Sequence, residues 1–298
     1  MKKGYNVFLD KNSKIARSQI EKHETFRLNY FDLPEIKYAS IEDIKEILPK
    51  QNNIYYKRFS EVLENENLLV ILNVFFKKIL LKISSKMKLP NKRYWVEWDK
   101  KNIGKEFYRK KLTKKTIAYM VGRYQEYYYL ENIKEDILKD FSFSQNTPIS
   151  VNRYKSGIIM NNSVSIHIRR GDYTGKKEFD ICTMTYYKNA IDYIQNKEKN
   201  LVYYIFSDDL EWTKSNFDFL DNHYIVDNSQ YDSSDYYDLY LMSICKHNII
   251  PNSTFSWWAA YLNRNLNKII LCPDKWNGMD LVLTDEICPK EWRRISII

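Results

Sequence analysis

The second half of the chain alternates between two kinds of segment, and this alternation limits its fold more than any other feature. Short runs rich in β-branched and aromatic residues predict strands at residues 163–168, 202–206, 223–226, 248–250 and 268–272. Segments with helical periodicity lie between most of them, at residues 185–197, 210–220, 235–247 and 254–265. Strands and helices that alternate at this spacing build βαβ units. The sequence therefore predicts an α/β fold with a parallel sheet and helices on both of its faces.

The first half of the chain predicts a less regular set of elements. Residues 5–10 and 94–98 are strand candidates. Residues 58–90 and 131–141 have a largely helical pattern, and Ser40 is placed to open a further short helix.

A polar stretch separates the two halves. Residues 145–160 contain turn formers and show no helical pattern. We therefore place the domain boundary there, with a first domain at residues 1–150 and a second at residues 151–298.

The charge of the chain favours an acidic partner without choosing one. The formal net charge is +9 at pH 7, which suits nucleic acid, an anionic membrane surface or a phosphorylated substrate. A merely lysine-rich surface explains the same excess equally well. The charges are dispersed along the chain and no recognised DNA- or RNA-binding signature is present, so nucleic acid is the least favoured partner.

The cysteines and the apolar segments bear on the compartment. Four cysteines, at positions 182, 245, 272 and 288, show neither close pairing nor metal-ligand spacing, which is typical of free thiols in a reducing cytosol. The first residues turn polar too soon for a signal peptide. The most apolar run, residues 68–83, is broken by Lys77 and Lys78 and is too short to span a bilayer. We therefore expect a cytoplasmic protein.

The stretch SIHIRRGDY, residues 165–173, joins a predicted strand to a turn that contains an Arg-Gly-Asp tripeptide. An adhesion ligand must be displayed outside the cell, so the expected compartment disfavours that interpretation. Two others stay open and are about equally supported by the motif alone. The turn is either an ordinary solvated turn with a structural Arg–Asp pair or an anion-binding corner.

The order of residues in this stretch shows how such a corner would be built. Alternation along the strand places His167 and Arg169 on the same side. Arg170 then falls at the end of the strand, Gly171 permits a sharp turn, and Asp172 can hold an arginine in place. Ligands of parallel α/β sheets bind at the carboxyl ends of the strands, and paired guanidinium groups match the oxygens of a diphosphate.

A second candidate segment lies between a predicted strand and a predicted helix. Asn252, Ser253 and Thr254 stand at this junction, where a hydroxyl can cap the helix and the helix N-terminus can bind an anion. Trp257 and Trp258 follow and are expected in the core. The chain has only seven glycines and no GxG or Walker-type loop, which removes the commonest routes to NAD or ATP binding.

Two acidic segments complete the list of candidates. Asp235 and Asp238 open a predicted helix, a position that acids favour for structural reasons as well as for ligand binding. Asp208 and Asp209 follow a predicted strand and open the next helix. We predict that they form an N-cap and do not hold a metal.

Several of these segments together resemble the fucosyltransferases of glycosyltransferase family 11, which are typically α-1,2-fucosyltransferases. HIRRGDY (167–173) looks like their first motif, and YYIFSDDLEW (203–212) matches a strand-and-turn segment. The most distinctive similarity is the block at residues 238–263, and residues 122–143 look like the family's segment before the interdomain link. The resemblance covers most of residues 94–276.

This resemblance implies both an architecture and a reaction. Such enzymes have the GT-B fold, which consists of two Rossmann-like domains with the active site in the cleft between them. They transfer L-fucose from GDP-β-L-fucose with inversion, usually to the 2-hydroxyl of a terminal galactose. They use no metal and no further cofactor. The expected partners are therefore GDP-fucose and a galactose-terminated surface glycan, which can be lipid-linked and so bring the protein to the inner face of the membrane.

The resemblance also implies roles for single residues. Arg169 and Arg170 would neutralise the departing pyrophosphate. The donor-binding candidates from the other motifs are Asp238, Asn252, Ser253, Thr254 and Ser256. Inversion requires a group that takes the proton of the acceptor hydroxyl, for which His167 and Asp172 are the candidates. His167 is explained equally well as a support for the arginines.

The beginning of the chain departs from the family pattern. Family members usually start with a strand and a GGLGNQ-like loop, whereas this sequence begins at about the second strand. We therefore expect an incomplete first Rossmann-like domain. The alternative function is a catalytically impaired remnant that binds a sugar nucleotide or a glycan.

Overall fold

The computed structural model describes residues 125–143, 147–279 and 283–298, together with short pieces of the earlier chain at 8–9, 31, 33, 37–40, 43, 94–96 and 119–121. Contacts divide the chain into two compact units. The first contains Met1–Phe26 and Pro34–Tyr124, and the second, called here the C-terminal unit, contains Arg27–Leu33 and Gln125–Ile298. The predicted domain boundary near residue 150 stays a prediction.

Little of the first unit is described. Strands β1 (Tyr94–Val96) and β2 (Tyr119–Val121) pair in parallel, and β1 lies within the predicted strand at 94–98. The Ser40 hydroxyl accepts a hydrogen bond from the Asp43 backbone N–H at 3.0 Å, as expected of a helix cap. The predicted helices at 58–90 and most of the predicted strand at 5–10 lie outside the described residues.

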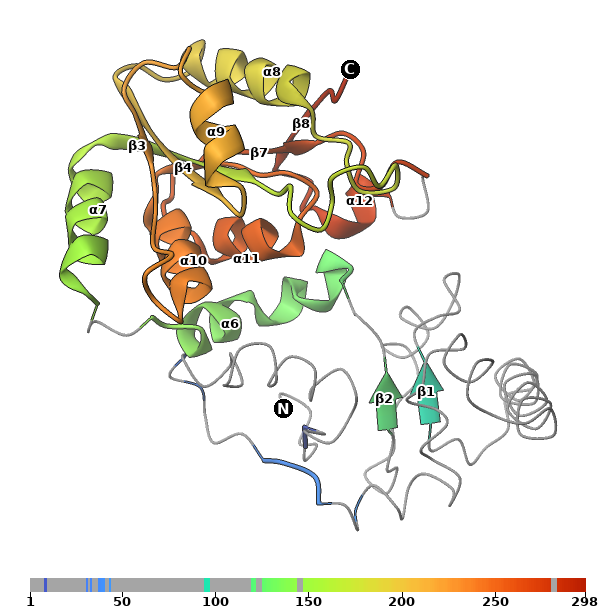
Figure 1. Ribbon diagram of the computed structural model, residues 1–298. Helices are drawn as coiled ribbons and strands as arrows, with labels where there is room; N and C mark the ends of the chain where they lie inside the picture. Colours follow the sequence, from blue (N-terminus) through green and yellow to red (C-terminus); the bar gives the residue numbers. More distant parts are fainter. Residues whose placement is uncertain are drawn as a thin grey trace, which may run out of the picture. The chain divides into compact units, whose positions relative to one another are not determined.

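The C-terminal unit is built on a six-stranded sheet in which all neighbouring strands are parallel (Figure 1). The strands are β3 (Asn162–Ile168), β4 (Leu201–Ser207), β5 (His223–Ile225), β6 (His247–Ile249), β7 (Ile270–Pro273) and β8 (Arg293–Ile295). Their order in the sheet is β5-β4-β3-β6-β7-β8. The predicted α/β fold with a parallel sheet is confirmed, and all five predicted strands of this half are present.

Helices connect the strands of the C-terminal unit. They are α7 (Ile149–Met160), α8 (Met184–Gln195), α9 (Leu210–Asn216), α10 (Ser234–Ile244), α11 (Thr254–Leu262) and α12 (Thr284–Ile287). Two short 3₁₀ turns, Tyr127–Tyr129 and Glu131–Ile133, precede α6 (Lys134–Asp140). Among the residues described here, no helix combines the length and the apolar character that crossing a bilayer requires.

The core follows from the alternation of side chains along the strands. Ile166 of β3 and Ile205 of β4 pack with α8 on one face of the sheet. Tyr204 and Phe206 of β4 point to the other face and pack with α7 and α10. Figure 1 shows α8 and α9 on one side of the sheet and α10 and α11 on the other. The central strands are therefore buried on both faces, as parallel strands require.

Helix α7 and strand β8 are two of the elements that were not predicted from the sequence. Helix α7 forms within the stretch 145–160, where no helical pattern was found. Its two buried side chains, Val151 and Ile158, stand seven residues apart among polar residues, so a hydrophobic period is hardly visible. A Cβ at Gly157 would lie 2.5 Å from the Tyr204 hydroxyl, which shows how closely α7 approaches β4. Strand β8 was also missed. It is an edge strand whose first two residues are arginines.

A buried hydrogen-bond network ties the central strands to α10 and α11. The Asn248 amide donates to the Ser165 hydroxyl at 2.7 Å and to the Met242 carbonyl at 2.8 Å. The Asn263 amide donates to Asn248 Oδ1 at 2.7 Å and to the Cys245 carbonyl at 2.8 Å. Asn248 has 0% exposure. Because water cannot reach its amide, these bonds provide the hydrogen-bond partners that the buried amide needs.

We expect Asn248→Leu to lower the free energy of unfolding by about 3 kcal/mol, because Asn263 and Ser165 would each lose a buried partner. Urea denaturation of the full chain measures the change. Asn196→Leu is the control, since the Asn196 side chain is exposed at the end of α8 and bonds only to its own helix. Equal losses for both variants would contradict a stabilising role of the network.

Candidate functional site

The strand order places the predicted site residues together. The chain leaves β3 towards β4 and β5 on one side, and later returns to build β6, β7 and β8 on the other side. The direction in which successive strands are added to the sheet therefore reverses between β3 and β6, although all strands remain parallel. In doubly wound α/β sheets a ligand crevice lies at this point, outside the carboxyl ends of the strands. Arg169 and Arg170 follow β3 directly, and Asn252 and Ser253 follow β6.

Arg169 is held by two carboxylates. Its guanidinium Nη2 lies 2.8 Å from Asp172 Oδ1, and Nη1 lies 2.8 Å from Asp208 Oδ2. The side chain keeps 33% exposure, and its guanidinium carbon stands 5.6 Å from the ring centre of Tyr173. The predicted Arg–Asp172 pair is present. Gly171 makes the turn possible, because a Cβ there would lie 2.8 Å from Asp208 Oδ2.

Arg170 is fixed by the other acid at the end of β4. Its Nε donates to Asp209 Oδ2 at 3.1 Å, and its backbone N–H donates to Asp208 Oδ1 at 2.8 Å. The guanidinium carbon lies 4.1 Å from the ring centre of Trp212, which is close enough for a cation–π contact. Arg169, Arg170, Asp208 and Asp209 are called here the arginine corner.

Asp208 and Asp209 have a role that the sequence interpretation missed. Asp209 is the predicted N-cap, since its carboxylate accepts from the Trp212 backbone N–H at 3.1 Å. The same carboxylate bonds Arg170, and the two contacts, the backbone one above all, lower the pKa of Asp209. Asp208 bonds both arginines. The sequence feature that could have indicated this role is the pair of acids that follows β4. Their arginine partners could not be predicted, because the pairing depends on which strands are neighbours in the sheet.

His167 lies in β3 beneath the corner. Its ring is buried, its centre is 5.5 Å from that of Phe255, and its Nδ1 has no hydrogen-bond partner within the described part of the chain. Burial, together with the nearby charge of Arg169, lowers the pKa of His167 to about 3. A neutral imidazole with this pKa is a weak proton acceptor near pH 7. These properties do not suit general base catalysis.

The segment after β6 is mostly buried, and of its predicted site residues only Thr254 is partly exposed. The buried Asn252 amide donates to the carbonyls of Phe179 at 3.0 Å and Trp276 at 3.3 Å, so it fastens two neighbouring loops. Ser256 has 0% exposure and donates to the Ser253 carbonyl at 3.3 Å. Ser253 occupies the N-cap position of α11, but its side chain makes no capping bond. Thr254, the first residue of α11, is half-buried.

Asp238 lies in the first half of α10. The Asn228 amide donates to Asp238 Oδ1 at 2.7 Å. Burial is the main cause that raises the pKa of Asp238 to about 7, and the charges of Asp235 and Asp227 act in the same direction. Asn228 Oδ1 is buried without a partner among the described residues. The Asp238 carboxylate and Asn228 Oδ1 are therefore hydrogen-bond acceptors, and acceptors of this kind call for N–H or O–H donors.

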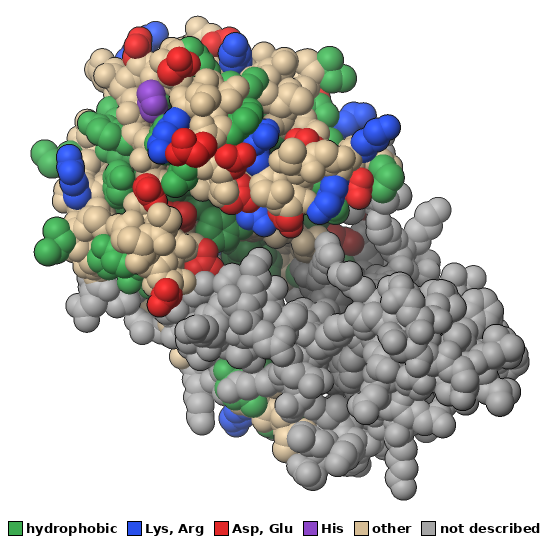
Figure 2. Space-filling model, viewed as in Figure 1, with side chains coloured by type: hydrophobic (Ala, Val, Ile, Leu, Met, Phe, Trp, Pro, Cys, Tyr) green, Lys and Arg blue, Asp and Glu red, His purple; other side chains and the backbone are tan. Residues whose placement is uncertain are grey.

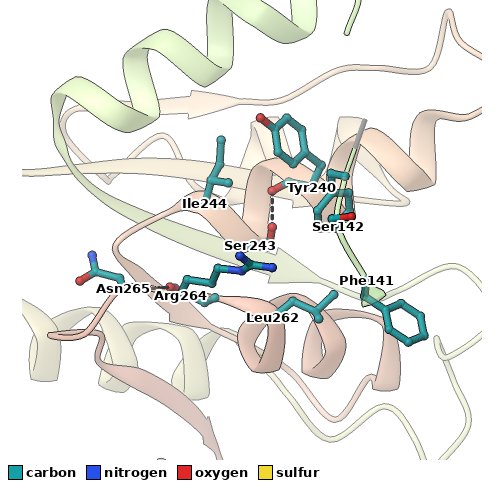
Figure 3. Close-up of a pocket in the computed structure, with 10 residues that line it drawn as sticks. Phe141, Ser142, Tyr240, Ser243, Ile244, Leu262, Arg264 and Asn265 are labelled. Carbon is teal, nitrogen blue, oxygen red and sulfur yellow. Dashed lines mark hydrogen bonds between the residues drawn. The ribbon is translucent and has the colours of Figure 1, made fainter. Parts of the chain in front are cut away.

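Two further features of the C-terminal unit bear on ligands. A cavity of about 390 Å³ lies away from the arginine corner, between Phe141–Phe143 and the carboxyl ends of α10 and α11 (Figure 3). None of the predicted site residues lines it. Among the described residues, no three His, Cys, Asp or Glu side chains are grouped so that they could hold a metal ion. Metal-independent chemistry stays a prediction.

These features define an α/β protein with two ion-paired arginines at the point where the strand order of its sheet reverses. The sequence pattern of the family described as "Glycosyl transferase family 11" matches residues 54–296. The chain therefore belongs to glycosyl transferase family 11, as the sequence resemblance predicted.

Individual relatives cover different shares of the chain. The O-antigen biosynthesis glycosyltransferase WbnK of Escherichia coli is 44% identical over 128 residues, which are 41% of this chain and 42% of WbnK. An alpha-1,2-colitosyltransferase of Escherichia coli is 36% identical over 212 residues, 66% of this chain and 69% of the relative. The galactoside 2-alpha-L-fucosyltransferase SEC1 of Bos taurus is 24% identical over 56% of this chain and 45% of its own. The chain thus spans less than half of two of these three relatives.

The unusual pKa of His167 can be tested directly. We expect the His167 ring to remain neutral from pH 8 down to about pH 4 in NMR titrations of the folded protein, because burial opposes its charged form. In the unfolded chain a histidine gains a proton near pH 6.5. Stability should therefore fall as the pH drops below about 6.5, and His167→Gln should weaken this dependence. Titration of His167 near pH 6.5 would contradict its burial.

Proposed function

We propose that this protein transfers a fucose-like sugar from a guanosine diphosphate donor to a hydroxyl group of a glycan. Membership of glycosyl transferase family 11 supports transfer of this kind of sugar, since the related proteins are named fucosyl- and colitosyltransferases. The observation that carries the proposal is the arginine corner at the end of β3. L-fucose is the favoured sugar and GDP-β-L-fucose the favoured donor.

The arginine corner suits the charge that forms during the reaction. When the bond between the anomeric carbon and the donor phosphate breaks, negative charge develops on the departing diphosphate. Arg169 and Arg170 are oriented by Asp208 and Asp209 before any ligand arrives. Cations that are fixed in advance stabilise such charge without reorganising during the reaction. The half-buried Thr254 hydroxyl, at the N-terminus of α11, can bind a further phosphate oxygen. Ser253 is only 4% exposed.

Asp238 suits the base of the donor. Guanine presents adjacent N–H donors on one edge, and the half-buried Asp238 carboxylate can accept them. Asn228 Oδ1 and His167 Nδ1 are buried within the protein, so neither is assigned a contact with the donor. Asn252 and Ser256 support the site, since both are engaged in holding the loop after β6.

Inversion requires the acceptor hydroxyl to attack the anomeric carbon from the side opposite the diphosphate and to give up its proton. Asp172 is better placed than His167 to receive that proton, because its side chain is 61% exposed whereas His167 is buried. We propose the 2-hydroxyl of a terminal galactose in a surface glycan as the acceptor. The printed names of SEC1 and WbnK, which refer to galactosides and to O-antigen biosynthesis, support this choice.

The face of the C-terminal unit that Figure 2 shows gives no support to nucleic-acid binding. Figure 2 shows acidic and basic side chains interspersed on the visible face, whereas nucleic-acid-binding surfaces gather their cations.

Replacement of either arginine of the arginine corner should slow sugar transfer. We expect Arg169→Ala and Arg170→Ala each to lower kcat about 100- to 1000-fold, because each removes a preorganised cation from the leaving group. Calorimetry with GDP-fucose and a transfer assay with a galactoside measure both effects in the full chain. Arg153→Ala, which changes an exposed arginine of α7, is the control. Donor binding without transfer in the unaltered protein would favour the binding-only alternative, and wild-type turnover in both variants would overturn the mechanism.

The pKa of Asp238 predicts how donor binding depends on pH. We expect the affinity for GDP-fucose to rise about tenfold between pH 6 and pH 8, because the ionised carboxylate accepts the guanine N–H bonds and its pKa in the free protein is about 7. Asp238→Asn should weaken binding and abolish this dependence. Isothermal titration at several pH values tests both points. A flat profile in the unaltered protein would show that Asp238 does not contact the donor.

A further inference from the structure

The edge of the sheet opposite the arginine corner carries exposed apolar side chains among cations. Because the strands are parallel, the loops that lead into β3, β4, β6 and β7 all lie at this edge. Met160 is 84% exposed and Leu266 is 97% exposed. We call the following residues the strand-start surface: Met160, Lys197, Lys199, Lys246, Leu266 and Arg264.

Hydrogen bonds fasten these loops to one another. The Asn162 amide donates to the Lys199 carbonyl at 2.9 Å, which joins the loops before β3 and β4. The Lys246 backbone N–H donates to the Ser163 hydroxyl at 3.1 Å. The Ile269 backbone N–H donates to His247 Nδ1 at 3.0 Å. Neighbouring parallel strands lie about 4.8 Å apart, so the four loops form one continuous surface.

The loop before β7 displays Leu266 to solvent. Asn263 Oδ1 accepts from the Asn265 backbone N–H at 2.8 Å, and Asn265 Oδ1 accepts from the Asn267 backbone N–H at 3.1 Å. These two side-chain turns hold the loop in a compact form. At 97% exposure Leu266 buries almost no surface in the folded protein, so folding does not explain a large apolar residue at this position.

Cations outnumber acids in the loops before the four central strands. The loops before these strands contribute Lys197, Lys199, Lys246, Arg264 and Lys268, with Glu198 as their acid. The flanking loops before β5 and β8 are more acidic, with Asp218, Asp221 and Glu291 against Lys290. Cations after helix C-termini also offset the helix dipole. That effect explains the charges in part, but it does not explain exposed Met160 and Leu266 beside them.

The cavity between Phe141–Phe143 and the ends of α10 and α11 adjoins this surface. Asn263, Arg264 and Asn265 line one part of it, and Ile244 and Leu262 line another. Figure 3 shows the Arg264 side chain extending along the cavity between Ser243 and Leu262. Apolar and cationic side chains are therefore neighbours in this cavity as well as on the strand-start surface.

We propose that the strand-start surface docks on an anionic lipid bilayer. Cations attract the negative headgroups, while apolar side chains enter the boundary between headgroups and acyl chains. Nucleic acid would use the cations but has no need of Met160 and Leu266. The seven residues of β3 span about 23 Å, so the arginine corner faces away from the bilayer at about that distance, open to a glycan that extends from the membrane.

Vesicle flotation of the full chain tests the proposal. We use vesicles of phosphatidylglycerol and phosphatidylcholine, with pure phosphatidylcholine vesicles as the uncharged comparison. The protein should bind the anionic vesicles at 50 mM salt and dissociate as salt rises. Lys197→Gln with Lys199→Gln should weaken partitioning about 25-fold, about fivefold for each cation. Met160→Ser with Leu266→Ser should weaken it about tenfold.

Matched variants exclude general effects of charge and hydrophobicity. Lys188→Gln with Lys214→Gln removes two exposed cations from α8 and α9, and Ile298→Ser removes an apolar side chain that is 89% exposed beyond β8. Both should bind vesicles like the unaltered protein, and thermal unfolding should show that all variants fold. Three results would overturn the proposal: no vesicle binding, equal losses in the control variants, or full binding by the serine variant, which would indicate a general polyanion site. None of these readouts depends on donor binding.

Discussion

The candidate site depends on one interaction, the pairing of two arginines at the end of β3 with two acids at the end of β4. Arg169 and Arg170 would repel each other and move freely if they projected alone into solvent. Asp208 and Asp209 bind one guanidinium each, and Asp209 also caps α9. Half-exposed ion pairs of this kind add little to stability. Their effect is geometric, because they fix the positions of the two guanidinium groups.

The order of the strands determines which other segments lie beside these ion pairs. The reversal between β3 and β6 brings the arginine corner next to the loop of Asn252 and Ser253. The buried contacts between Asn248, Ser165 and Asn263 hold β3, β6 and α11 in register beneath that junction. A polar network at 0% exposure thus supports the site from below. The same sheet separates the proposed donor-binding edge from the proposed membrane-docking edge by the length of its strands.

The electrostatic properties of the site come from burial as much as from charge. His167 loses its ability to take a proton because it is enclosed beneath a cation, whereas Asp238 holds its proton up to about pH 7 because it is enclosed beside other acids. Both residues were candidates from the sequence, but their properties could not be predicted from it. A pKa depends on how many protein atoms surround a group, and those atoms come from distant segments.

Much of the C-terminal fold was determined by the sequence alone. The alternation of strand and helix patterns is a local property of the sequence. It predicted the parallel sheet and its five strands from β3 to β7, and it predicted the segments that carry Arg169, Asn252 and Asp238. Helix α7 was not predicted because only Val151 and Ile158 mark its buried side. Strand β8 was not predicted because it begins with two arginines. The tertiary structure alone decided which strands are neighbours, and with that the partners of Arg169 and Arg170. The physical reason is that periodicity records which face of an element is buried, whereas strand order is set by packing between segments that are far apart in the chain.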